Sequence, residues 1–119
     1  MSKKTEPSAI RILLAFEYKH TTYMDAVRTA VRGSHPQAQV LAIDPGALEA
    51  EMDRFDPHVL VCELPAPENP CNNLPACIEL AIDPSQPFRF RVGQRRWESL
   101  NPGLAELIAI VADTDQTSP

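Results

Sequence analysis

Residues 54–65 read Arg-Phe-Asp-Pro-His-Val-Leu-Val-Cys-Glu-Leu-Pro, and no other stretch of the chain has so clear a pattern. The apolar run begins after Pro57, carries one carboxylate at Glu63 and stops at Pro65. Short apolar runs bounded by turn residues are typical of strands buried on both faces in parallel α/β sheets. We therefore expect a strand over 58–64. Glu63 would lie at its carboxyl end, where open α/β sheets bind ligands.

Two strands and two helices are expected before this stretch. Residues 10–16 and 39–43 are short apolar runs that predict a central strand and a second strand. A Thr-x-x-Asp capping box and apolar residues at helical spacing predict a helix over about 23–32. An Asp-Pro start predicts a second helix over 44–56. The resulting order, β-α-β-α-β, favours an α/β sheet with right-handed crossovers.

The second half of the chain is less regular. Residues 65–76 contain four prolines, which prevents a long helix there. Residues 77–82 are mostly apolar, and 88–92 alternate Phe-Arg-Phe-Arg-Val, so one face of that strand should be buried and the other wet. The short connection between these runs suits a hairpin. A last helix is expected over 101–112.

Length and charge restrict the class of protein. A chain of 119 residues is about the usual size of one domain, which we place at 10–112, between a disordered leader at 1–9 and a flexible tail at 113–119. The net charge of −5 disfavours nucleic acid and membrane surfaces as partners. No apolar stretch reaches the roughly 18 residues of a membrane span, and the start has no signal-peptide core. We expect a cytoplasmic protein.

The three cysteines are Cys62, Cys71 and Cys77. An odd number in a chain expected in the cytoplasm does not predict a disulfide framework. Cys62 should pack within a strand. We interpret Cys71 and Cys77 as two free thiols, with a regulatory disulfide or half of a metal site as the alternatives.

Three segments resemble the receiver domains of response regulators. Residues 55–65 resemble the segment that presents the phospho-accepting aspartate, 12–17 resemble the first strand with its acidic end, and 101–108 resemble the start of the last helix. The resemblance implies a flavodoxin-like α/β fold. Its open, three-layer, mainly parallel sheet would have the order 2-1-3-4-5 and helices on both faces, with an antiparallel hairpin of strands 4 and 5 as a variant.

The residues on which that family's phosphorylation depends are not matched. Tyr18 stands where a second acid is expected, Glu63 takes the acceptor aspartate's place, and Asn101 stands where a lysine precedes the proline. The resemblance therefore implies a degenerate receiver, a regulatory protein-interaction domain in signal transduction that is not switched by aspartyl phosphorylation. We assign no catalytic residue and no cofactor.

A second hypothesis uses the carboxylates at the carboxyl edge of the sheet. Glu17 follows the first strand and Glu63 ends the third, and magnesium prefers carboxylate oxygen. On this alternative the protein is a ligand-binding or magnesium-binding domain, or a small enzyme.

Basic residues gather near the end of the chain, next to the only tryptophan. This expected interaction surface comprises Arg89, Arg91, Arg95, Arg96 and Trp97. Arginine beside an aromatic residue is typical of protein interfaces, so the expected partner is another protein or a second copy of the chain. The same composition also suits a nucleotide or single-stranded nucleic acid, which is the remaining alternative. A solvated edge strand that uses charge against aggregation is the competing interpretation. For Trp97 itself we also weigh a role as a core residue that anchors the turn.

Overall fold

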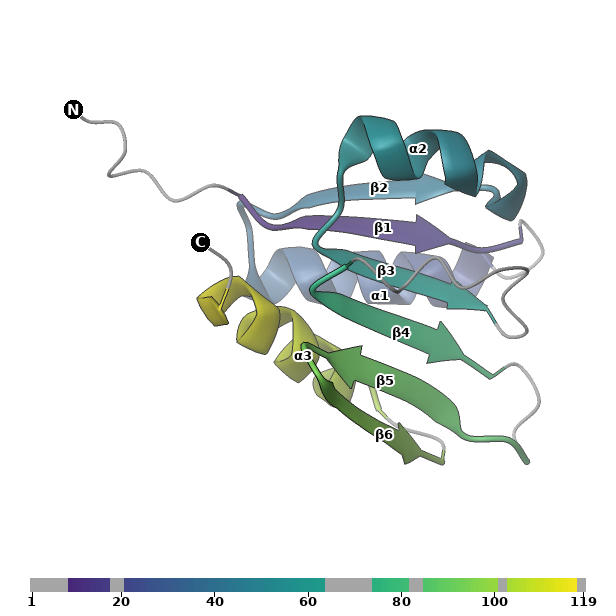
Figure 1. Cartoon of the computed structure of the whole chain (residues 1–119), viewed down its shortest axis with the longest axis vertical. Coiled ribbons are helices and arrows are strands. Elements are labelled where there is room, and N and C mark those ends of the chain that lie inside the picture. Colours follow the sequence, from purple (N-terminus) through teal and green to yellow (C-terminus); the bar gives the residue numbers. More distant parts are fainter. Residues whose placement is uncertain (1–8, 18–20, 64–73, 82–84, 101–102, 118–119) are drawn as a thin grey trace.

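The computed structural model describes residues 9–17, 21–63, 74–81, 85–100 and 103–117 (Figure 1). In chain order the elements are β1 Arg11–Ala15, α1 Thr21–Ser34, β2 Gln39–Ile43, the 3-10 turn η3 Pro45–Ala47, α2 Leu48–Phe55, β3 Val59–Glu63, β4 Ala76–Leu80, β5 Phe88–Val92, β6 Arg95–Ser99 and α3 Leu104–Thr117. The leader predicted at 1–9 lies almost wholly outside the described residues.

All the strands form one mixed sheet with the order β2-β1-β3-β4-β5-β6 (Figure 1). The neighbours from β2 to β4 are parallel, whereas β4–β5 and β5–β6 are antiparallel. The predicted flavodoxin-like, mainly parallel sheet is therefore wrong. A parallel crossover needs a dozen or more residues. The segment between Leu80 and Phe88 is too short for one, and the described residues hold only three α-helices.

The sixth strand was not predicted. β5 and β6 are joined by the two-residue loop Gly93-Gln94, and Gly93 has φ 61. Glycine at the first loop position is what a type II′ hairpin turn requires. The Gly-Gln pair between an alternating run and Arg-Arg-Trp-Glu-Ser is the signal in the sequence for this hairpin.

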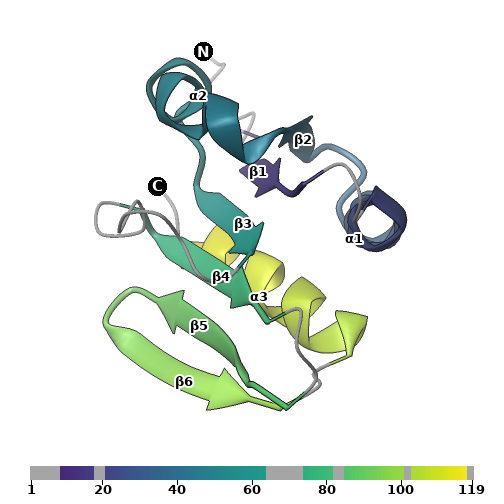
Figure 2. The same ribbon diagram turned by 90° about the vertical axis from the view of Figure 1, so that its right-hand side faces the viewer.

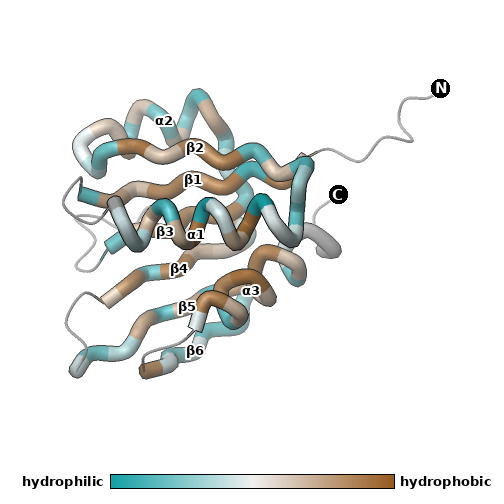
Figure 3. The backbone as a smooth tube through the Cα atoms, turned by 180° about the vertical axis from the view of Figure 1, so that it is seen from behind, coloured by the Kyte–Doolittle hydropathy of each residue, from teal (hydrophilic) through white to brown (hydrophobic). Residues whose placement is uncertain are grey.

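Helices cover the two faces of the sheet unequally. α1 and α3 pack side by side on one face, and α2 lies on the other (Figures 2 and 3). The larger core lies under α1 and α3 and includes Ile12, Val61 and Phe90. The smaller core lies under α2, where Leu48 meets side chains of β1, β3 and β4. We call the first side the helix-pair face and the second the α2 face.

The helix boundaries follow local chemistry. Asp44 accepts a hydrogen bond from the Gly46 amide at 2.8 Å, as an N-cap acid should, and Asp56 ends α2 with φ 54. α3 runs on to Thr117, beyond the predicted end at residue 112. Thr114 is fully buried in that extension, and its hydroxyl donates to the Ile110 carbonyl at 2.8 Å. This bond satisfies a polar group that would otherwise be costly to bury.

Within the described ranges, none of the helices has both the length and the apolar character needed to cross a bilayer.

Candidate surface on the β5–β6 hairpin

The alternation predicted for 88–92 is confirmed. Phe90 and Val92 are buried on the helix-pair face, and Arg89 and Arg91 point to the α2 face. The β5–β6 register places Glu98 opposite Arg89 and Arg96 opposite Arg91. α2 packs against β1, at the far side of the sheet. We call the following side chains on the α2 face the charged face: Glu79, Arg89, Arg91, Arg96 and Glu98.

Two arginines of the charged face have defined partners. Arg89 Nε lies 3.8 Å from Glu98 Oε2, with both side chains about 60% exposed (61% and 58%). Such an exposed pair contributes roughly 0–1 kcal/mol. Arg91 donates to the carbonyls of Gly93 at 2.8 Å and Leu74 at 2.7 Å, which fixes its guanidinium on the turn and on the segment before β4.

Arg96 is in a different position. It lies opposite Arg91, a residue of the same charge, and its side chain is exposed. In the described part of the chain, no carboxylate lies within ion-pair distance of Arg96. Like charges directly opposite each other in a sheet are destabilising, so Arg96 is a charge that the monomer leaves uncompensated.

The other side of β6 is tied to α3. Trp97 Nε1 donates to Glu106 Oε2 at 3.4 Å, and the Ser99 hydroxyl donates to Glu106 Oε1 at 3.3 Å. The Trp97 ring stacks on Phe90 with a centroid separation of 5.4 Å. Arg95 forms an ion pair with Asp113, and its guanidinium carbon lies 5.5 Å from the centroid of the Trp97 ring.

The structure therefore divides the predicted cluster between two faces. Arg89, Arg91 and Arg96 belong to the charged face, and Arg95 and Trp97 belong to the helix-pair face. Trp97 is half-buried against the core, so the interpretation of this residue as an anchor fits, but it anchors a strand and not only a turn.

Glu17 and Glu63, the carboxylates of the second hypothesis, lie at the carboxyl ends of β1 and β3. Glu63 is the last residue of β3, pairs with Leu80 of β4 and is half-buried. Glu17 is exposed, just beyond the end of β1, which is the neighbouring parallel strand. The residues that the structure describes contain no group of three His, Cys, Asp or Glu side chains that could hold a metal ion.

The cysteines differ in chemical state. Cys62 is a free thiol within β3, and burial, with smaller contributions from the charges of Glu79 and Glu63, raises its pKa to about 12. A thiol with so high a pKa is a poor nucleophile at neutral pH. Cys77 is disulfide-bonded, which corrects the interpretation of it as a free thiol, and Cys71 lies outside the described residues.

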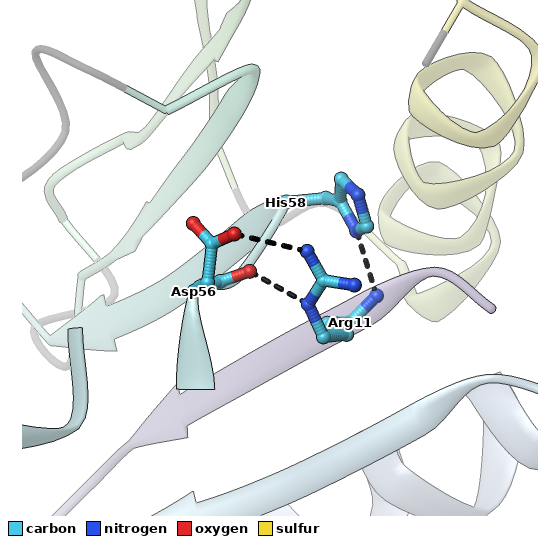
Figure 4. A network of polar contacts seen from close by, with 3 residues as sticks. All are labelled: Arg11, Asp56 and His58. Carbon is cyan, nitrogen blue, oxygen red and sulfur yellow. Dashed lines mark hydrogen bonds and ion pairs between the residues drawn. The ribbon is translucent and has the colours of Figure 1, made fainter. Parts of the chain in front are cut away.

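A polar cluster where β1 and β3 begin, at the amino ends of these strands, was not predicted (Figure 4). Arg11 donates through Nε to the Asp56 carbonyl at 2.7 Å and through a terminal nitrogen to Asp56 Oδ2 at 3.2 Å. Its backbone N–H donates to His58 Nδ1 at 2.9 Å, which requires that nitrogen to be unprotonated. The cluster joins the end of α2 to the start of β1. It could not be predicted from the sequence, because Arg11 and Asp56 are 45 positions apart.

No family model, curated protein or solved structure matches this chain. The resemblance to receiver domains stays a prediction. The function must therefore be argued from the arrangement of the chain's own side chains.

That arrangement suits binding. β6 is the last strand of the sheet (Figure 2). It carries charged side chains on the α2 face and an aromatic anchor on the helix-pair face. Exposed edge strands present unpaired backbone groups that can accept another strand. The guanidinium groups add directional donors for carboxylates of a partner.

Proposed function

We propose that this protein is a non-catalytic protein-interaction domain with a regulatory role, and that its contact surface is the β5–β6 hairpin. The observation that carries the proposal is Arg96, an exposed arginine on the edge strand that has only an arginine opposite it in its own chain. Charge complementarity fixes register and partner choice at interfaces more than it adds raw affinity. The partner should therefore present a carboxylate to Arg96.

The hairpin is held in place before any partner arrives. Glu106 bonds both Trp97 and Ser99, and Asp113 holds Arg95, so α3 fixes the strand from behind. Ordering side chains on association costs roughly 0.5–1.5 kcal/mol for each immobilised group. A strand that is already ordered avoids part of this cost.

An exposed apolar residue adjoins the same edge. Leu100 follows β6 directly, and its side chain is 59% exposed. Among the described residues it is the one large hydrophobic residue that is exposed. A single exposed leucine needs no explanation by itself. Next to an open edge strand, it adds apolar area to the proposed surface.

A photo-crosslinking amino acid tests the surface in intact cells. Placed at Leu100, which adjoins the surface and leaves Arg96 in place, it should form covalent adducts with another polypeptide chain, which mass spectrometry then maps to that position. The matched control is Glu49, exposed on α2 at the other side of the sheet. Equal adduct yields at the two positions would contradict the proposal.

The second candidate function is a ligand or magnesium site formed by Glu17 and Glu63. It is favoured by their position after neighbouring parallel strands, where open α/β sheets bind ligands. Titration with magnesium, alone and with beryllofluoride, decides the matter by amide resonance shifts. Saturable shifts at both residues, lost in Glu63→Gln, support the site. Unchanged resonances leave the interaction domain as the function.

The proposed compartment is the cytoplasm, where a small acidic regulatory domain has its partners. Disulfides persist mainly in oxidising compartments, so the bond at Cys77 tests this part of the proposal. Because Cys77 is buried, the cells are lysed directly into denaturant with an alkylating reagent, before any reduction, and Cys77 should be labelled if the compartment is reducing. Protection of Cys77 in the denatured chain until a reductant is added would contradict a cytoplasmic location.

A further inference from the structure

We infer that the partner of the β5–β6 hairpin is a second copy of the same chain, joined by antiparallel pairing of β6 with its counterpart about a two-fold axis at Trp97. The inference rests on the proposed function and names the partner. The two sheets would then form one continuous sheet, with β2 at both outer edges.

The open side of β6 is free of secondary structure in the described ranges. β6 ends the sheet opposite β2, and α3 packs over β4 and β5 instead of over the outer edge (Figure 2). A two-residue hairpin bonds the residues on either side of its loop, and hydrogen-bonded pairs alternate along an antiparallel ladder. We therefore expect the backbone groups of Arg96 and Glu98 to point away from β5, where a second strand can bond them.

The register follows from the charges. Residues directly opposite each other in a two-fold antiparallel pair share a face of the sheet, because side chains alternate with period two. Centring the pair on Trp97 sets Arg96 opposite the second copy's Glu98, and the symmetry makes that contact twice. Centring it on Arg96 or on Glu98 sets like charges opposite each other, which is unfavourable. The Trp97 register is the one that matches the charges.

The same register places a carboxylate opposite Arg96, whose charge has no carboxylate within ion-pair distance in the described part of its own chain. Arg96 has Arg91 on its inner side, and a carboxylate from the second copy would arrive on its outer side. On the helix-pair face, Arg95 would lie opposite the second copy's Ser99 and keeps its own ion pair with Asp113. Trp97 would meet its counterpart at the axis, already stacked on Phe90.

Two single substitutions test the pairing without disturbing the core. Arg96→Glu sets like charges opposite at both contacts of the dimer, and Glu98→Arg does the same with the opposite sign. Each variant alone should sediment as a monomer at concentrations where the wild-type chain sediments as a dimer. Mixing the two variants should restore the dimer, because each contact then joins a carboxylate to a guanidinium. Thermal unfolding of each variant checks that the fold is retained.

Several outcomes would overturn the inference. A dimer that persists in either variant alone shows that copies associate through another surface. A mixture that stays monomeric shows that positions 96 and 98 do not face each other. A wild-type chain that stays monomeric, while crosslinking at position 100 in cells captures a different protein, refutes the second copy as partner and leaves the proposed function standing. Absence of any adduct at position 100 contradicts both.

The salt dependence supplies an independent check. Raising the salt concentration from about 0.01 M to about 0.5 M shortens the screening length severalfold and should shift the wild-type chain towards monomer. The control variant Glu49→Lys lies on α2 and should keep the wild-type dissociation constant and its salt dependence. A dimer that is indifferent to salt would contradict pairing through these charges.

Discussion

The two edges of the sheet are built on opposite principles. β2 is apolar, and its side chains enter both cores, with Val40 and Ala42 on the helix-pair face and Leu41 and Ile43 under α2. β6 is charged, is exposed along most of its length, and is held by α3 through polar contacts. One edge strand thus contributes apolar side chains to both cores, and the other carries a specific charge pattern.

This difference explains where association can occur. A charged edge strand resists unspecific pairing but accepts a partner with matching charges. The apolar side chains of β2 therefore contribute to the stability of the monomer, and the contact surface that we propose lies at the β6 edge.

The largest expected effect is a loss of stability at the β2 edge. Leu41→Ala removes a side chain packed against the core under α2 and should lower the free energy of unfolding by about 2 kcal/mol. The matched change at the other edge, Arg96→Ala, should alter the stability of the monomer by less than about 0.5 kcal/mol. Urea unfolding at low protein concentration measures both. Similar losses at the two positions would contradict the distinction between the edges.

A second effect is expected between the two edges, next to the strand at which the sheet changes from parallel to antiparallel. There Cys62 of β3 lies beside Glu79 of β4. The pKa of Cys62 is about 12 in the folded chain and 9.0 ordinarily, so the folded state holds the proton longer than the unfolded state does. The resulting stability is present below pH 9 and is lost as the pH rises towards 12.

Denaturant unfolding between neutral and strongly alkaline pH measures this loss. Cys62→Ala should weaken the pH dependence, because the titrating thiol is gone. Tyr23, whose pKa burial also raises, contributes in the same direction in both proteins and cancels in the comparison. A pH dependence that is identical in the two proteins would show that Cys62 is not protected from ionisation by the fold.

The smallest expected effect is at the contact between Arg11 and Asp56, which joins the end of α2 to the start of β1. Asp56→Asn removes an ion pair with Arg11 whose carboxylate side is 84% exposed, and should cost less than about 0.5 kcal/mol. Asparagine tolerates the φ of 54, whereas Asp56→Ala introduces a strain of roughly 1–2 kcal/mol. Thermal unfolding of the two variants separates charge from backbone conformation. An equal loss of stability in both variants would show that the contact between Arg11 and Asp56 stabilises the fold through its ion pair and not through the backbone conformation.

The failure of the fold prediction has a local cause. The β-α-β-α-β order of the first half was visible in the apolar runs and caps, and the helices and strands lie close to where the sequence predicts them. The resemblance to receiver domains then extended a parallel pattern into a second half that lacks room for it. The length of the segment before Phe88 and the Gly93-Gln94 loop were the signals for antiparallel strands, and both are local.

The candidate surface was predicted in composition and not in arrangement. Arg89 and Arg91 share a face because side chains alternate along a strand, and that much follows from spacing alone. Their relation to Arg95, Arg96 and Trp97 depends on the turn, whose two-residue loop sets which residues oppose each other. Leu100 carries no signal in the sequence, because apolar residues after a strand are usually buried.

The periodicities and the helix caps depend on neighbouring residues, and the net charge depends on composition alone, so all three can be read from the sequence. The contacts of Glu106 with Trp97 and Ser99, and of Arg11 with Asp56, join residues from separate elements, and their formation depends on the packing of whole helices and strands. The Gly93-Gln94 loop sets Arg96 opposite Arg91, which is a local relation. That no carboxylate of the described residues lies within ion-pair distance of Arg96 depends on the tertiary structure, because it depends on where every other element packs.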